Sequence, residues 1–116
     1  MVLTIIPLAG IPEVRPGDNV ARMIVEAGNE ASGIETGDVI VVTQKIVSKA
    51  EGRVLSLDTV TPSLAAERLA AETEKDPRLV ELILRESRGV VRQRGPILIT
   101  ETKHGFICAN AGIDAS

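Results

Sequence analysis

Apolar residues recur along the chain at two spacings, which predict helices and strands in alternation. Val20, Met23, Ile24 and Ala27 follow the i, i+3, i+4, i+7 spacing of an amphipathic helix. Gly28 comes directly after this pattern, and glycine is common just past the last turn of a helix. We therefore expect a helix that begins near Val20 and ends at Gly28.

Short apolar runs in the first half of the chain predict strands instead. Val2–Ile6 is rich in β-branched residues, and the Val39–Val42 run is apolar on both faces, which suits a buried strand. Val54, Leu55 and Leu57 suggest a further short strand. The intervening Lys45–Ala50 segment is compatible with a short helix or with a loop.

Two helix-start signals predict a pair of helices in the second half. Thr61-Pro62-Ser63 opens an alanine-rich helix that we expect to run to about Glu74. Asp76-Pro77 is a second start, with proline at the first helical position, and Gly89 is expected to end that helix. The buried face of the second helix is predicted to consist of Leu79, Val80, Leu82 and Ile83.

The last apolar runs predict a hairpin. Pro96–Thr100 and Phe106–Ala109 read as strands that Glu101–Gly105 would join. Strands and helices are thus mixed, so the predicted class is α/β (mixed α+β), with short strands and about three helices. At 116 residues the chain fits one domain, residues 1–116.

Composition narrows the function classes. Phe106 is the only aromatic residue, so the core must be aliphatic and the chain has almost no residues that could stack on bases or flavin rings. The net charge of −3 argues against a general nucleic-acid binder. A local basic cluster could form a phosphate-binding track, but Glu81 and Glu86 offset its charge, which favours a solvated helix face. The cluster consists of Arg85, Arg88, Arg92 and Arg94.

The N-terminal sequence and the single cysteine exclude targeting and membrane segments, intrachain disulfides and cysteine-rich metal sites. Met1–Gly10 is apolar but has no basic flank and contains Pro7, so it is neither a signal peptide nor a membrane span. Cys108 stands alone, so an intrachain disulfide or a cysteine-rich zinc site is excluded. A lone cysteine fits a reducing compartment, and beside Ile107 it is expected to be a small buried hydrophobe.

Two segments could hold an anion. Lys45 and Lys49 follow the predicted Val39–Val42 strand, and ligands in α/β folds gather at the carboxyl ends of strands. A lysine there can neutralise a phosphate, although position alone favours a solvated lysine, and no Walker A glycine run precedes it. Gly10-Ile11-Pro12-Glu13 could present backbone amides to an anion or be an ordinary turn.

The C-terminal segment offers a carboxylate and a histidine. Asp114 lies in a Gly/Ala/Ser setting, where it could bind a hard divalent cation or simply form a turn. His104 is the only histidine, and beside Gly105 it is expected to be an exposed turn residue.

Taken together, several ungapped blocks resemble the coenzyme F-420:L-glutamate ligase family, also called the F-420-0:γ-glutamyl ligases. The similarity runs from Leu3 to Ser116. The blocks that carry it are Pro7–Pro12, Gly37–Val42, Lys45–Arg53, Asp76–Glu81, Ile83–Ser87 and His104–Ser116.

The resemblance implies GTP-dependent addition of L-glutamate to the carboxylate of a deazaflavin coenzyme (F-420) precursor, by way of an acyl phosphate. It implies Mg²⁺ or Mn²⁺ on Asp114 and a K⁺ requirement. Lys49 would contact a phosphate of GTP, and Gln44 stands where relatives often have serine. The implied GTP-contacting residues are Gly10, Ile11, Pro12, Glu13, Gln44 and Lys49. We assign no catalytic residue, because the chain offers no convincing covalent nucleophile and the mechanism needs none.

The resemblance also bears on the whole protein. Family members continue beyond Ser116, so we expect residues 1–116 to be the N-terminal part of such a ligase, inactive alone. The implied partners are GTP, L-glutamate, the deazaflavin precursor and a second copy in a homodimer, with no nucleic acid and no membrane, in the cytoplasm. The alternative is a non-catalytic nucleotide-binding or interaction domain that keeps the fold.

Overall fold

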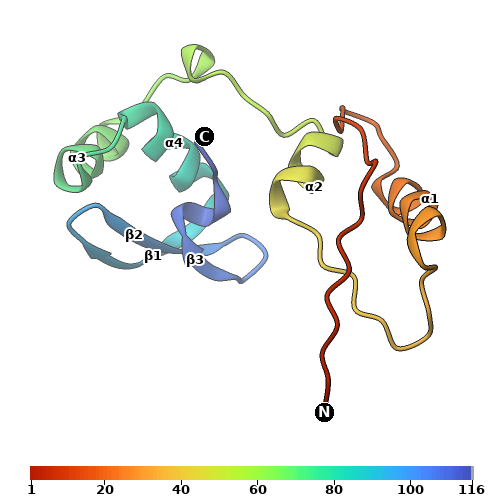
Figure 1. The fold of residues 1–116 in the computed structure, drawn as a ribbon. Coiled ribbons are helices and arrows are strands. Elements are labelled where there is room, and N and C mark those ends of the chain that lie inside the picture. Colours follow the sequence, from red (N-terminus) through yellow and green to blue (C-terminus); the bar gives the residue numbers. More distant parts are fainter. Residues whose placement is uncertain (116) are drawn as a thin grey trace. The chain divides into compact units, whose positions relative to one another are not determined.

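Helices alternate with long extended segments in the first part of the chain, whereas helices and a sheet make up the second. The computed structural model describes residues 1–115. Two units are distinguished, Met1–Val54 and a second that begins at Leu55 (Figure 1). Within the described residues there are four α-helices, where about three were expected, and a three-stranded sheet. The predicted mixed α/β class is confirmed.

The first helix, α1 (Val20–Ala31), begins where the apolar spacing placed it. Asn19 caps it, because its side-chain oxygen accepts a hydrogen bond at 3.0 Å from the backbone N–H of Arg22. The predicted end at Gly28 is wrong, since the helix continues to Ala31. Gly28 is buried, and a Cβ atom there would lie 2.7 Å from the side chain of Ile34. The lack of a side chain at Gly28 therefore allows close packing against Ile34 and does not mark the end of the helix.

The segment that was compatible with a helix or a loop is a helix, α2 (Gln44–Ala50). Lys49 lies in its last turn. The end of α2 is tied to the loop before α1, because the N–H of Gly17 donates to the carbonyl of Ala50 at 2.8 Å. This bond holds the loop that follows Pro12 against the last turn of α2.

The strands predicted in the first unit are wrong. Neither Val2–Ile6 nor Val39–Val42 belongs to a strand, and the latter is not buried, since Val39 is 84% exposed and Val41 90%. An apolar run becomes a strand only if a neighbouring segment pairs with it. No such pairing occurs for these two runs within residues 1–115.

In the second unit, α3 (Leu64–Thr73) and α4 (Pro77–Glu86) pack through small residues. Ala66 and Ala70 of α3 and Val80 of α4 are buried together, which allows a close approach of the two helices. Both starts are capped as predicted. The Ser63 hydroxyl accepts from the N–H of Ala66 at 3.2 Å, and Asp76 accepts from that of Arg78 at 2.8 Å.

The sheet is antiparallel in the order β1-β2-β3, with α3 and α4 on one side of it (Figure 1). Its strands are β1 (Ser87–Arg94), β2 (Ile97–Thr102) and β3 (Ile107–Ala109). Alternate residues of β2 are buried, namely Leu98, Thr100 and Thr102. The predicted hairpin between β2 and β3 is confirmed. A second hairpin, β1–β2, turns at Gly95-Pro96 and was not foreseen.

Two boundaries in the second unit differ from expectation. Helix α4 ends at Glu86 rather than Gly89, because the chain from Ser87 onward pairs with β2. Arg88, Arg92 and Arg94 therefore lie on β1, and the predicted basic helix face is wrong. The strand expected around Val54–Leu57 is also wrong, since the short 3₁₀-helix η1 spans Leu57–Thr59. No helix in the described part is long and apolar enough to cross a bilayer.

Candidate functional site

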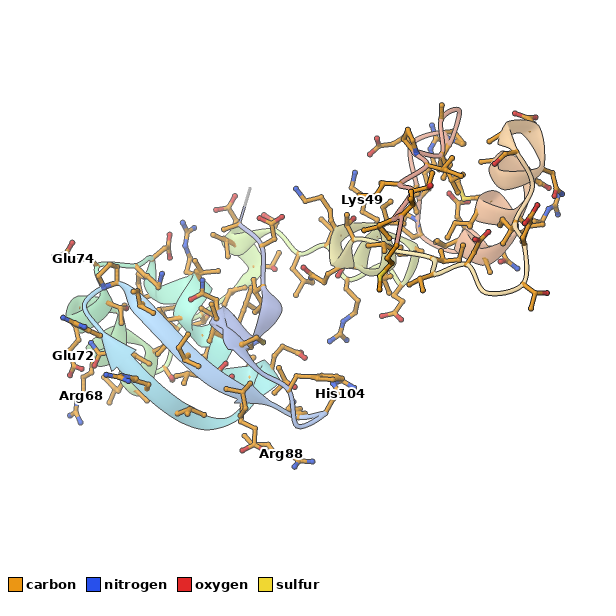
Figure 2. The ribbon with its side chains drawn as sticks, turned by 60° about the horizontal axis from the view of Figure 1, so that its bottom comes forward. Lys49, Arg68, Glu72, Glu74, Arg88 and His104 are labelled. Atoms are coloured by element: carbon orange, nitrogen blue, oxygen red, sulfur yellow. The ribbon has the colours of Figure 1, made fainter. Side chains whose placement is uncertain are left out.

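Two of the sequence-predicted nucleotide segments meet at the end of α2. The Lys49 ammonium donates a hydrogen bond to the Glu13 carboxylate, and the two form an ion pair across thirty-six residues of sequence. The Lys49 side chain, labelled in Figure 2, is 34% exposed and that of Glu13 is 72% exposed. The pair is therefore open to solvent and to ligands.

The backbone around Glu13 explains why this contact forms. Gly10 has φ +80°, a left-handed conformation that glycine adopts without strain. Val14, next to Glu13, is 7% exposed and anchors the segment in the first unit. The Gly17–Ala50 hydrogen bond then fixes the loop beside the last turn of α2. Glu13 and Lys49 are held between these two attachments.

The charges of the pair act on each other. The hydrogen bond from Lys49 lowers the pKa of Glu13, its Coulomb attraction lowers it further, and Arg15 adds a smaller effect in the same direction. Glu13 is therefore ionised at neutral pH. The arrangement places an accessible ammonium beside a carboxylate, and such an ammonium can also bind a phosphate oxygen.

Gln44 lies at the other end of α2 and makes a contact of its own. Its side-chain amide donates to the Ser48 hydroxyl at 3.0 Å. With about 100° of rotation per residue, Gln44 and Lys49 leave the helix roughly 140° apart. Gln44 is exposed, but the structure does not bring it onto the face that carries Lys49.

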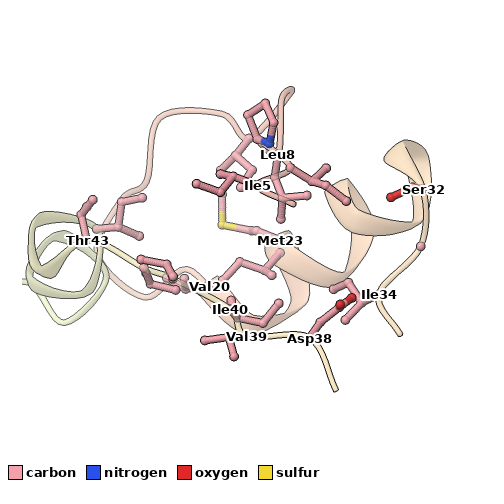
Figure 3. Close-up of a pocket in the computed structure, with 18 of the residues that line it drawn as sticks. Ile5, Leu8, Val20, Met23, Ser32, Ile34, Asp38, Val39, Ile40 and Thr43 are labelled. Carbon is pink, nitrogen blue, oxygen red and sulfur yellow. The ribbon is translucent and has the colours of Figure 1, made fainter. Parts of the chain in front are cut away.

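An apolar cavity of about 940 Å³ lies in the first unit (Figure 3). Ile5 and Leu8 line it from the N-terminal segment, Met23 from α1 and Val39 from the segment before α2. Its lining also includes Ile11, so it borders the Gly10–Glu13 segment. Predominantly apolar walls suit a hydrophobic group and not a phosphate.

Asp114 belongs to the second unit, where it follows a tight left-handed turn. Asn110, Ala111 and Gly112 have φ values of 52°, 53° and 74°. Such a run is costly for the two non-glycine residues and persists only where the surroundings hold it. Asp114 itself is exposed and has an interaction of its own. The turn thus presents its carboxylate at the surface.

The described residues fit a metal ion only in part. No group of three or more His, Cys, Asp or Glu side chains in residues 1–115 could hold one. A single carboxylate such as Asp114 fits one ligand position of Mg²⁺ or Mn²⁺, ions that usually keep water and substrate phosphates as further ligands. A complete protein cage is not formed by this part of the chain.

The remaining two candidate residues, His104 and Cys108, lie in the sheet of the second unit and its turn. His104 lies exposed in the turn between β2 and β3, as predicted (Figure 2). Cys108 is half-buried on β3, opposite Thr100, and so is less enclosed than expected. Sequence reasoning treated Glu13 only as part of a backbone turn and missed its side-chain pairing. The opposite charges of Glu13 and Lys49 were the available signal, but nothing local indicated their contact.

Comparison with known proteins gives one family. The profile described as F420-0:Gamma-glutamyl ligase matches residues 10–116. The chain is 46% identical over 117 residues to the coenzyme F420:L-glutamate ligase of Methanothermobacter thermautotrophicus, covering 100% of this chain and 46% of the relative. It is 48% identical over 104 residues to that of Methanopyrus kandleri, covering 90% and 40%.

A third relative gives the same result. The coenzyme F420:L-glutamate ligase of Archaeoglobus fulgidus is 38% identical over 116 residues, which cover 100% of this chain and 45% of the relative. The chain therefore spans less than half of the length of these relatives.

Proposed function

Because this chain belongs to the F420-0:gamma-glutamyl ligase family, we propose that it supplies the first part of a ligase that joins L-glutamate to a coenzyme F420 precursor with the use of GTP. The names of its relatives support the glutamate and F420 parts of this proposal. The use of GTP comes from the family resemblance of the sequence motifs.

The proposed reaction has two steps. First, a carboxylate oxygen of the precursor attacks the γ-phosphorus of GTP, the bond to the β-phosphate breaks, and an acyl phosphate and GDP result. Second, the amine of glutamate attacks the acyl carbon, the carbon–oxygen bond to phosphate breaks, and an amide, inorganic phosphate and a proton result. Phosphorylation is needed because a free carboxylate has no adequate leaving group, and such a transfer depends on positioning and charge neutralisation.

Each residue then has a definite task. The Lys49 ammonium binds a phosphate oxygen of GTP, and backbone N–H groups of the Gly10–Glu13 segment contact the same nucleotide. Gln44 contributes an amide contact at the start of α2. Asp114 is proposed as one ligand of Mg²⁺ or Mn²⁺, which would supply further neutralisation of phosphate charge. The K⁺ requirement and the homodimer are proposed on the family resemblance alone.

The observation that carries the proposal is the contact between Glu13 and Lys49. Two segments assigned to the nucleotide from sequence motifs could have lain far apart. Instead, a hydrogen bond joins them at the end of α2. Their proximity supports a common ligand, and the Lys49 ammonium, whose side chain is 34% exposed, is a group that suits a phosphate.

A chimera provides the test. Residues 1–116 would replace the matching segment of the Methanothermobacter thermautotrophicus relative, and glutamate-dependent GDP release would be measured with GTP, Mn²⁺, K⁺ and the precursor. We expect turnover that requires GTP and is not supported by ATP. A chimera that folds and binds GTP but never releases GDP would support a non-catalytic domain, and equal use of ATP would remove the claim for GTP.

A further inference from the structure

We propose that the Glu13 carboxylate competes with phosphate for Lys49: it occupies the ammonium in the nucleotide-free protein and yields its place to a phosphate oxygen when nucleotide binds. This inference rests on the proposed function, which assigns Lys49 to a phosphate. It gives the Glu13 side chain a role distinct from the backbone contacts of the Gly10–Glu13 segment.

The geometry supplies the first argument. Glu13 reaches Lys49 from a separate segment, so the contact is a tertiary interaction rather than a consequence of helical spacing. A carboxylate oxygen and a phosphate oxygen are both anionic acceptors for an ammonium. Glu13 therefore occupies one of the three N–H donors of the ammonium, and a phosphate oxygen cannot accept from that same N–H.

Exposure supplies the second argument. With 72% of the Glu13 side chain exposed, a departing carboxylate returns to water without a burial penalty. Exposed ion pairs contribute little, so the contact should be easily exchanged. A polyphosphate brings more charge than one carboxylate and can accept hydrogen bonds from several donors at once. Exchange is therefore favourable for a polyphosphate, whereas a small singly charged anion gains little over Glu13.

Electrostatics supplies the third argument. Besides Lys49, the cation whose charge acts on the Glu13 carboxylate is Arg15, which follows Glu13 closely in the sequence. If the carboxylate stays near Lys49 after phosphate binds, it repels the phosphate. Removing its charge should thus strengthen phosphate binding even if the exchange is incomplete. A Glu13 that merely anchors Lys49 in a productive position would give the opposite result.

The experiment uses the chimera that carries residues 1–116 and inorganic tripolyphosphate with Mg²⁺, titrated by calorimetry. We expect Glu13→Gln and Glu13→Ala each to tighten binding by about two- to fivefold, the range that a surface ion pair represents. Lys49→Ala should weaken binding by about tenfold or more, because a charge-assisted hydrogen bond is lost. Glu51→Gln is the matched control: it removes the same charge from an exposed residue two positions after Lys49 and should change binding less than Glu13→Gln.

A second measurement tests the pair in solution. The Glu13 carboxyl group would be titrated by carbon NMR in the wild type and in Lys49→Ala, where its pKa should rise toward the ordinary value. An unchanged pKa would overturn the inference, because it would mean that the two groups do not interact in solution.

The outcomes separate this inference from the proposed function. If Lys49→Ala weakens binding but both Glu13 variants bind the same or more weakly, the competitor role is overturned and the phosphate role of Lys49 stands. If Lys49→Ala binds as well as the wild type, the phosphate role itself fails. No binding by any variant, Glu13→Gln included, would overturn both.

Discussion

The carboxylate of Glu81 in α4 accepts a hydrogen bond at 2.9 Å from the backbone N–H of Ser63, the residue that caps α3. In a capping box, a Glu on the same helix makes this bond to the cap residue. Here a neighbouring helix supplies it, and Glu81 also pairs with Arg85 at 2.8 Å. The start of α3 is thereby joined to the middle of α4.

Ser63→Ala should destabilise the second unit by about 1 kcal/mol, the usual cost of removing an N-cap side chain. The hydroxyl acceptor for the Ala66 N–H is lost, and the bond from the Ser63 backbone to Glu81 remains. Urea denaturation followed by the methyl NMR signals of Leu98 would measure the change. Thr61→Ala, at an exposed position nearby, is the control. Equal midpoints for the two variants would contradict the assignment of Ser63 as the cap.

Low pH should reduce the stability of the second unit, because the carboxylates of Asp76 and Glu81 become protonated. Hydrogen bonds from Arg78 lower the pKa of Asp76 to about 2, and those from Ser63 and then Arg85 lower that of Glu81 to about 2. Because both folded-state values lie below the ordinary 3.8 and 4.5, the unfolded chain binds protons first as pH falls. The stabilisation is therefore complete above the ordinary values and is lost as pH falls toward 2.

The measurement is the urea midpoint at a series of pH values from about 6 to about 2. We expect a fall that steepens below the ordinary carboxyl range, and Glu81→Gln should make it shallower. A midpoint independent of pH across this range would show that neither carboxylate stabilises the folded state.

Ile83→Ala should lower the stability of the second unit more than the substitution of a helix cap does. Ile83 is 0% exposed at the contact of α4 with the rest of the second unit, and truncation of such a residue costs about 2–5 kcal/mol. Ile97→Ala is the comparison, because Ile97 is 56% exposed on β2. Thermal denaturation followed by the Leu98 methyl signals should show a much larger shift for Ile83→Ala, and similar shifts would mean that this core is not packed as described.

Ala111→Gly should stabilise the turn before Asp114. Ala111 has φ 53°, and a left-handed conformation costs an alanine roughly 1–2 kcal/mol. Glycine removes that strain but makes the unfolded chain more flexible, so the expected net gain is below about 1 kcal/mol. Gly112→Ala, at φ 74°, should destabilise instead. Melting temperatures that move in the same direction for both variants would contradict this account of the turn.

Local signals predicted the second unit better than the first. Caps at Ser63 and Asp76 and the proline at the start of α4 act within a few residues, so they could be identified from sequence. The Val39–Val42 run also looked like a strand, but a strand needs a partner, and residues 1–115 provide none. Gly28 looked like a helix end because its close contact with Ile34 is tertiary.

In the candidate site, too, contacts between distant segments could not be predicted from the sequence. Motif similarity identified Gly10–Glu13, Gln44 and Lys49, and the structure brings Glu13 and Lys49 into contact. The pairing itself depends on the Gly17–Ala50 bond and the buried Val14, neither of which has a local sequence signature. The metal role of Asp114 stays a prediction, since no group of three or more His, Cys, Asp or Glu side chains among the described residues could hold a metal ion.

The most direct measurement compares Lys49→Ala with Lys103→Ala in the chimera that carries residues 1–116. GTP affinity and single-turnover GDP release would be measured for each. The account predicts that Lys49→Ala weakens GTP binding and slows GDP release, together by tenfold or more, since charge-assisted hydrogen bonds contribute about 1.5–3 kcal/mol. Lys103→Ala, at an exposed position in the second unit, should leave both unchanged. Wild-type affinity and rate for Lys49→Ala would contradict the central claim that Lys49 binds a phosphate of the nucleotide.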